Sequence, residues 1–155
     1  MSLPRRVSAS STPAVSGVCR TVTPSWDYGG YEGITTADIQ CTRPDWNLWT
    51  DGVVPGPAAH PGESPQQVGD RADRALARVA PTLLDAEAGD VVLVAHAHLP
   101  RVLAARRLGP PPAAGALFAL DTRSVSRLGT EHGRPVITSW NAIAGTSPNG
   151  VSTVP

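Results

Sequence analysis

The chain has 155 residues, a length that suits one domain with a single hydrophobic core rather than two domains. Hydrophobic residues make up 41% and charged residues 17%, which excludes both a disordered polyelectrolyte and a membrane protein. The 13 basic and 13 acidic residues cancel, so the composition offers no attraction for nucleic acid or anionic lipid. All the basic residues are arginine, which excludes lysine Schiff-base chemistry. With two cysteines and no signal-peptide-like apolar run, we expect a cytoplasmic protein.

The first regular elements are short. A turn rich in aromatic residues and glycine covers residues 25–33. Thr35 or Thr36 is then expected to cap a helix that continues to about Thr42. Residues 50–62, rich in proline and glycine, are predicted to form a loop.

The strongest helix signal follows this loop. The Ser-Pro-Gln-Gln run at residues 64–67 predicts a capping box with proline at the first helical position. Apolar residues then recur at spacings of three and four, forming one stripe: Val68, Ala72, Leu76, Val79 and Leu83. After this helix, the Val-Val-Leu-Val-Ala run at residues 91–95 predicts a buried strand of a parallel sheet, which ends at His96.

The last part of the domain combines a helix and a hairpin. A second helix is predicted over residues 100–108, ending at Gly109. Extended segments at residues 124–128 and 135–140, joined by a turn at 131–133, predict a β-hairpin.

Helix, buried strand and helix in this order predict an α/β fold with three layers, an α/β/α sandwich. We divide the chain into three parts. Residues 1–24 are predicted to be an N-terminal arm or a remnant strand, residues 25–144 the α/β domain, and residues 145–155 a flexible tail.

The His-x-His pair after the predicted strand is the first candidate for chemistry. Ligands of open parallel sheets bind beyond the carboxyl ends of the strands, so His96 is expected in a crevice as a base, acid or phosphate donor. The alternative is a histidine that is hydrogen-bonded at a strand end and has no chemistry. The spacing of His96 and His98 also suggests a metal site, but the other candidate ligands lie at no recognised spacing: Glu32, His60, Glu63, Asp121 and His132. We therefore predict no metal and no cofactor.

Two segments resemble one protein family. Residues 26–33 read Trp-Asp-Tyr-Gly-Gly-Tyr-Glu-Gly, and residues 94–101 read Val-Ala-His-Ala-His-Leu-Pro-Arg. They resemble the W-D-Y-G-x-Y-E-G and V-x-H-G-H-x-x-R segments of the histidine phosphatase superfamily, in its phosphoglycerate-mutase-like branch. Gly-Glu-Ser at 62–64 and Asp-Arg at 70–71 follow in the family's order. The resemblance covers residues 25 to about 141 and implies the three-layer fold of that family.

The resemblance also implies a phosphohistidine mechanism, from which this sequence departs. In the family, an R-H-G segment supplies the nucleophilic histidine and a phosphate-binding arginine. The sequence has no Arg-His-Gly, and because the chain begins after the point where it would lie, we expect a fold truncated of its first strand. Val7 replaces a second phosphate-binding arginine, with Arg6 one residue away, and Ser25 replaces the acidic proton donor. Ala97 replaces the glycine that follows the second histidine of the family. Of the family's phosphate-handling residues, His96 alone is securely retained.

These departures predict an enzyme repurposed for other chemistry. We expect cofactor-independent acid–base catalysis, such as cyclisation, dehydration or isomerisation, on a small non-phosphorylated organic substrate of a biosynthetic route. The predicted catalytic residues are His96, His98 and Glu32. The predicted substrate-binding residues are Arg6, Ser25, Trp26, Tyr28 and Glu63.

Two alternatives stay open. One is a non-catalytic pseudo-phosphatase that binds a ligand or regulates a partner. The other is a residual phosphomonoesterase in which Arg5, Arg6 and His96 make a makeshift site. Because a missing first strand would expose apolar surface and unpaired strand edges, we expect a homodimer that pairs through this region. Apart from a small-molecule substrate, no nucleic acid or membrane partner is expected.

Overall fold

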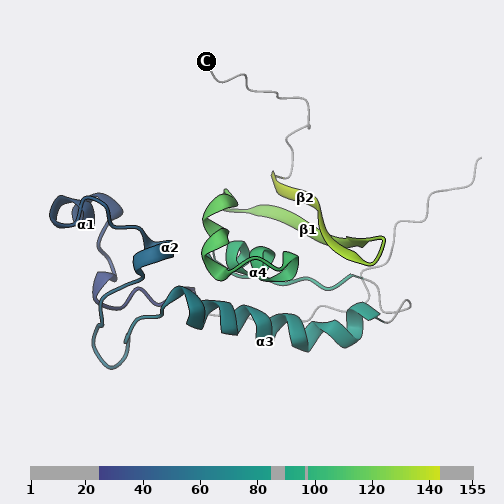
Figure 1. The fold of residues 1–155 in the computed structure, drawn as a ribbon, viewed down its shortest axis with the longest axis horizontal. Helices are drawn as coiled ribbons and strands as arrows, with labels where there is room; N and C mark the ends of the chain where they lie inside the picture. Colours follow the sequence, from purple (N-terminus) through teal and green to yellow (C-terminus); the bar gives the residue numbers. More distant parts are fainter. Residues whose placement is uncertain (1–24, 85–89, 97, 144–155) are drawn as a thin grey trace, which may run out of the picture.

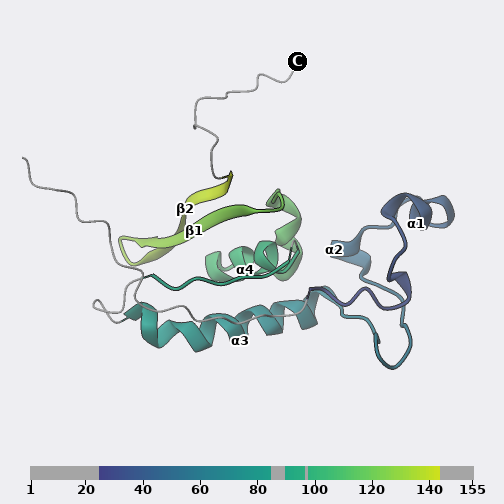
Figure 2. The same ribbon diagram turned by 180° about the vertical axis from the view of Figure 1, so that it is seen from behind.

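The computed structural model describes residues 25–84, 90–96 and 98–143. In Figures 1 and 2, α4 lies between α3 and the hairpin of β1 and β2, while α1 and α2 lie beyond the N-terminal end of α3. No helix in these ranges is long and apolar enough to cross a membrane. The elements, in chain order, are η1 (Gly29–Tyr31), α1 (Thr36–Thr42), α2 (Leu48–Asp51), α3 (Pro65–Leu84), α4 (His98–Leu108), η2 (Pro112–Leu117), β1 (Ser124–Glu131) and β2 (Arg134–Ile143).

Polar side chains start the two short helices. Thr35 Oγ1 accepts a hydrogen bond from the backbone N–H of Asp38 at 3.2 Å, and Asn47 Oδ1 accepts one from Trp49 at 2.9 Å. Each bond satisfies a backbone donor that has no partner within its helix. The helix predicted to end at about Thr42 and its threonine cap are therefore confirmed.

The predicted capping box starts α3. The backbone N–H of Gln67 donates to Ser64 Oγ at 3.3 Å, and the N–H of Ser64 donates to Gln67 Oε1 at 2.8 Å. Most of the predicted apolar stripe faces the interior, although Leu83 in the last turn is 51% exposed. The buried positions of this helix are Val68, Gly69, Ala72, Ala75 and Val79.

The second helix and the hairpin also agree with the sequence prediction. Helix α4 starts two residues earlier than predicted and is followed by Gly109, whose φ of +107° suits glycine. Strands β1 and β2 pair antiparallel around His132 and Gly133. Both residues have positive φ, 49° and 76°, as a tight two-residue turn requires.

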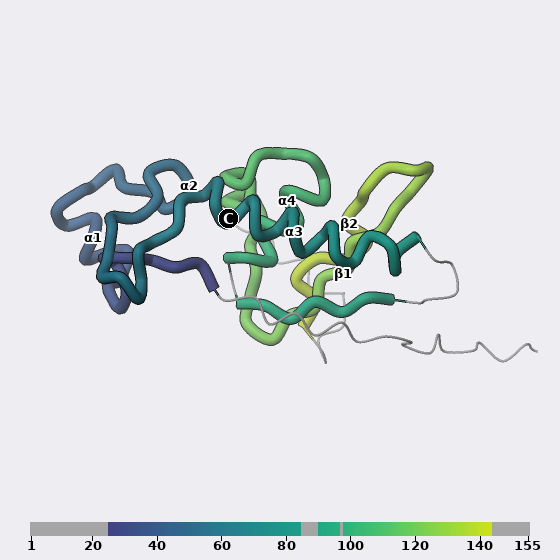
Figure 3. Tube along the Cα trace, turned by 90° about the horizontal axis from the view of Figure 1, so that it is seen from below, coloured from purple at the N-terminus to yellow at the C-terminus, as the bar shows by residue number. Residues whose placement is uncertain are grey.

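The prediction of a buried strand at residues 91–95 is wrong. In the part of the chain that the structure describes, these residues form no strand and none of them is buried. The sheet found there has two strands, β1 and β2, and neither pairs with this segment. Val92 and Val94 are 42% and 59% exposed. A strand forms only where a neighbour satisfies its backbone donors and acceptors, and the described residues place no such neighbour here. In Figure 3 the segment runs alongside α3.

The core joins the aromatic turn to the two long helices. Trp26, Val68, Leu99 and Val102 are the largest fully buried side chains, each at most 1% exposed. They come from the turn, α3 and α4, so burial of their apolar surface fixes these three segments against one another. The predicted arm at 1–24 and tail at 145–155 lie outside the described residues.

Candidate active site

Two segments that are 70 residues apart meet at His98. Tyr28 Oη lies 2.5 Å from His98 Nδ1. The imidazole also packs edge-to-face against Trp26 and Trp49, with ring centroids 6.2 and 5.4 Å away. The aromatic turn is thereby joined to the first residue of α4.

The Tyr28–His98 pair is neutral near pH 7. Burial lowers the pKa of His98, and the positive charge of Arg101 lowers it further. Burial raises the pKa of the Tyr28 phenol, and the Glu32 carboxylate adds to the rise. A neutral phenol donates its proton to an acceptor, which assigns Nδ1 of His98 as the acceptor and Nε2 as the protonated nitrogen.

A second contact anchors the turn to α3. The Nε and Nη2 atoms of Arg71 donate to the two carboxylate oxygens of Glu63 at 2.7 Å each. One of these oxygens also accepts from the Asp27 N–H at 3.1 Å, and the Glu63 carbonyl accepts from the Trp26 indole at 2.8 Å. Arg71 further donates to the Ser25 carbonyl at 3.1 Å. Because the Arg71 and Glu63 side chains are only 16% and 19% exposed, this pair faces the protein rather than solvent.

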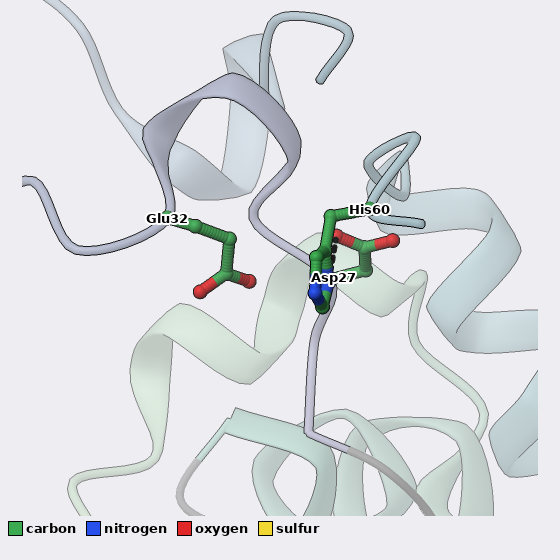
Figure 4. A group of neighbouring side chains, drawn as sticks. All are labelled: Asp27, Glu32 and His60. Atoms are coloured by element: carbon green, nitrogen blue, oxygen red, sulfur yellow. Dashed lines mark ion pairs between the residues drawn. The ribbon is translucent and has the colours of Figure 1, made fainter. Parts of the chain in front are cut away.

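Asp27 shapes the turn itself. Its carboxylate accepts hydrogen bonds from the backbone N–H groups of Gly29 at 3.0 Å and Gly62 at 3.2 Å. The His60 Nδ1 atom lies 3.9 Å from Asp27 Oδ1, and Figure 4 shows the two side chains facing each other with Glu32 nearby. The contact with Gly62 holds the loop before α3 close to the aromatic turn.

Among the described residues, Asp27, Glu32 and His60 form a group that could bind a metal ion. The ligand atoms of Asp27, Glu32 and His60 all lie within 4.8 Å of one another. Carboxylate and imidazole groups suit a divalent transition metal. Neither His96 nor His98 belongs to this group, so the structure does not assemble the His-x-His metal site considered above. That the protein binds no metal remains a prediction.

An open cavity of about 490 Å³ lies next to His98. Its walls include aromatic side chains from the turn, from α2 and from the loop before α2: Tyr28, Tyr31, Trp46 and Trp49. Glu32 lines it as well. Trp26, by contrast, is 1% exposed and packs edge-to-face against Trp49, with centroids 5.5 Å apart.

His96 is two residues before His98 in the sequence and is exposed. Its carbonyl accepts a hydrogen bond from the Leu99 N–H at 3.1 Å, which leads the chain into α4. Because two residues of extended chain span at most about 7 Å, the Cα atom of His96 lies within that distance of His98. His96 itself is not among the described residues that line the cavity.

Comparison with known proteins identifies the family. Residues 25–143 match the model of the histidine phosphatase superfamily, branch 1. The chain belongs to this superfamily. It is 45% identical over 108 residues to an acid phosphatase of Mycobacterium tuberculosis, which covers 70% of the chain and 49% of that protein. It is 35% identical over 92 residues to a sedoheptulose 1,7-bisphosphatase of Saccharomyces cerevisiae, covering 52% of the chain and 32% of that protein. The chain thus spans half or less of the length of these relatives.

Solved histidine phosphatase structures confirm the predicted α/β, phosphoglycerate-mutase-like fold. The protein of an open reading frame from M. tuberculosis is 40% identical, with a TM-score of 0.65 over 77% of this chain and 57% of that one. An alpha-ribazole phosphatase from Shigella flexneri is 21% identical, with a TM-score of 0.55 over 79% of this chain and 60% of that one. The second likeness supports the fold alone.

In this histidine phosphatase chain, the predicted site residues divide into two groups. Tyr28, Glu32 and His98 line the cavity, whereas His96 does not line it and is two residues before His98 in the sequence. Trp26, Ser25 and Glu63 do not line it: Trp26 lies in the core, while the Ser25 carbonyl and Glu63 bind Arg71. Arg6 lies outside the described residues. The catalytic and binding roles of all these residues remain predictions.

Two residues that organise the site, Asp27 and Arg71, were not among the predicted catalytic or substrate-binding residues, although the position of Arg71 near the loop at residues 50–62 suggested an anion contact. Asp27 bridges the turn and the loop before α3, and its Asp-x-Gly pattern is the local signal for such a turn. Arg71 pairs with a carboxylate eight residues earlier, for which no local pattern exists because the partner precedes the helix.

The prediction of a repurposed, non-phosphatase enzyme is wrong. The two curated relatives are named as phosphatases, which favours the phosphomonoesterase alternative over acid–base chemistry on a non-phosphorylated substrate and over a pseudo-phosphatase. The prediction relied on the absence of Arg-His-Gly. The chain matches only 49% of the acid phosphatase, so the absence of Arg-His-Gly from the chain does not exclude phosphatase activity.

Proposed function

We propose that this chain takes part in phosphomonoester hydrolysis, in which a phosphate monoester and water give an alcohol and inorganic phosphate. The observation that carries the proposal is the contact of Tyr28 Oη with His98 Nδ1 at 2.5 Å. This contact joins the aromatic turn to the segment that resembles the family's second-histidine motif, and this supports a role for the neighbouring His96. The relatives named acid phosphatase and sedoheptulose 1,7-bisphosphatase support this function.

The two histidines have different roles in the proposal. His96 is exposed, so its imidazole can reach a phosphoryl oxygen and donate a hydrogen bond or a proton as negative charge develops there. His98 is half-buried, neutral and held by Tyr28. It is a positioning residue, which fixes the start of α4 and with it the backbone next to His96.

A dianionic phosphoryl group also needs positive charge. Two of the described arginines already bind protein groups: Arg71 binds Glu63, and Arg101 binds two backbone carbonyls of η2 at 3.0 and 3.1 Å. We therefore expect the phosphate-binding arginines to come from outside the described residues, where the sequence has Arg5 and Arg6. A cytoplasmic location, suggested by the scarcity of cysteine, is part of the same proposal.

The test is hydrolysis of p-nitrophenyl phosphate by the 155-residue chain. We expect His96→Ala to lower kcat/KM by about 100-fold, the smaller end of what a positioned proton donor contributes. The matched control is His132→Asn in the β1–β2 turn, where φ is +49° and asparagine is tolerated. Absence of turnover in the wild-type chain, or equal turnover in the two variants, would contradict the proposal.

A further inference from the structure

The cavity beside His98 has one charged side chain in its described walls. Glu32 supplies that charge, and Tyr28 fixes its position by donating its backbone N–H to Glu32 Oε1 at 2.9 Å. Burial keeps His98 uncharged near pH 7. The described lining contains no arginine, and the chain contains no lysine at all.

Two arginines contact wall residues without lining the cavity. Arg43 donates to Tyr31 Oη at 2.9 Å, and the Arg101 guanidinium lies 4.6 Å from the centroid of the Trp49 ring. The Arg101 Nε and Nη2 atoms donate to backbone carbonyls of η2. Neither arginine belongs to the described lining, in which Glu32 is the one charged side chain, although the charge of Arg101 acts on the lining residues Tyr28 and His98.

The walls suit a flat, mostly apolar group. Four aromatic side chains belong to its walls, of which Tyr28 and Tyr31 are partly exposed while Trp46 and Trp49 are largely buried, and the exposed Ile34 adds apolar surface. The volume of about 490 Å³ is in the range of sites that hold small organic molecules. Aromatic side chains bind rings by stacking and edge-to-face contacts, in addition to the burial of apolar surface.

We propose that this cavity binds the alcohol part of the phosphate monoester. We further propose that this alcohol contains a ring and carries no charged group of its own. The inference rests on the proposed phosphatase function. A second phosphate or a carboxylate on the alcohol would lie near Glu32 with no cation in the described walls to balance it. The cavity thus selects uncharged phenolic or similar ring alcohols over sugar bisphosphates, the substrate class for which the yeast relative is named.

The test compares two esters of equal size that differ by one charge: 4-carbamoylphenyl phosphate and 4-carboxyphenyl phosphate. We expect the wild-type chain to hydrolyse the carbamoyl ester with a kcat/KM at least about tenfold higher, which is a differential binding effect of about 1.4 kcal/mol. Inorganic phosphate release measures both reactions.

Two variants assign the discrimination to the cavity. Ile34→Arg adds a cation at a lining residue that is 46% exposed, and we expect it to reduce the preference to about twofold or less. Glu32→Gln keeps the acceptor for the Tyr28 N–H while removing the charge, and the same reduction is expected. Val125→Arg, at a 67% exposed position of β1, makes the matched charge change away from the cavity and should keep the wild-type preference.

Each outcome decides a separate question. Equal kcat/KM for the two esters, or a preference for the carboxyl ester, would overturn the inference while the phosphatase function stands. A wild-type preference that neither Ile34→Arg nor Glu32→Gln alters would also overturn it, because the discrimination would then lie elsewhere. Hydrolysis of p-nitrophenyl phosphate but of neither ester would overturn this inference alone. Failure to hydrolyse any of the three compounds would overturn the proposed function and this inference with it.

Discussion

His98 couples protonation to folding through its burial. Burial and Arg101 lower its pKa in the folded protein below the ordinary value of 6.5. Below pH 6.5 the unfolded chain therefore binds more protons at this residue than the folded chain does, so its contribution to stability is complete above pH 6.5 and is lost as the pH falls. We expect the Tm of the wild-type chain to decrease between pH 7.5 and pH 5, and His98→Gln to show a smaller decrease. Thermal unfolding across this range, followed by circular dichroism, measures both; equal decreases would contradict the role given to His98.

Glu63 shows why residue type alone does not assign a role. A glutamate beside an aromatic turn suggests substrate binding, yet its two oxygens accept bonds from Arg71 and from the Asp27 N–H. Burying a carboxylate requires such partners, because an unpaired charge is costly away from water. The Arg71–Glu63 pair is thus first of all the link that keeps the turn against α3.

At the scale of elements, α3 and η2 approach so closely that a side chain would not fit between them. A Cβ atom at Gly69 would lie 2.3 Å from Pro112 Cγ. Alanine at an ordinary helix position would stabilise by about 1 kcal/mol relative to glycine, but here it collides with a rigid ring. We expect Gly69→Ala to lower the free energy of unfolding by about 1 to 3 kcal/mol, the usual range for overpacking.

Urea unfolding of the full chain measures this effect. Ala77→Gly, at an exposed position of the same helix, supplies the control for helix propensity and should cost about 1 kcal/mol. If Gly69→Ala instead raised the unfolding free energy, the close packing of α3 on η2 would be refuted.

Local signals predicted the elements well, and non-local contacts explain the differences. The threonine cap of α1, the capping box of α3 and the two-residue turn of the hairpin each depend on residues at most three apart, and each is found. The strand expected at residues 91–95 depends on a neighbour elsewhere in the chain, which apolar composition does not reveal. The Tyr28–His98 contact spans 70 residues, so only the family resemblance, and not a local pattern, indicated that these segments share a site.

At the scale of the whole molecule, we propose that the described residues form one side of the phosphatase site. They supply the aromatic cavity, Glu32 and the two histidines, while Arg71 and Arg101 bind protein groups. We propose that the phosphate-binding charge comes from outside the described residues, where the sequence has Arg5 and Arg6. A balanced net charge is compatible with the proposed division, in which the described cavity receives the alcohol part of the ester and not the phosphate.

We propose that the expected homodimer forms through the segment at residues 91–96. It has no ladder partner among the described residues, and Val92 and Val94 are 42% and 59% exposed. Because this segment lacks a ladder partner in the described part of the chain and exposes two valines, we propose that it pairs with a strand from another chain, which would satisfy its backbone groups and bury these side chains. We expect light scattering at micromolar concentration to give the mass of two 16.1 kDa chains, and Val94→Lys to give one. Val125→Lys on β1 is the control and should stay dimeric; a monomeric wild-type chain would rule out pairing through this segment.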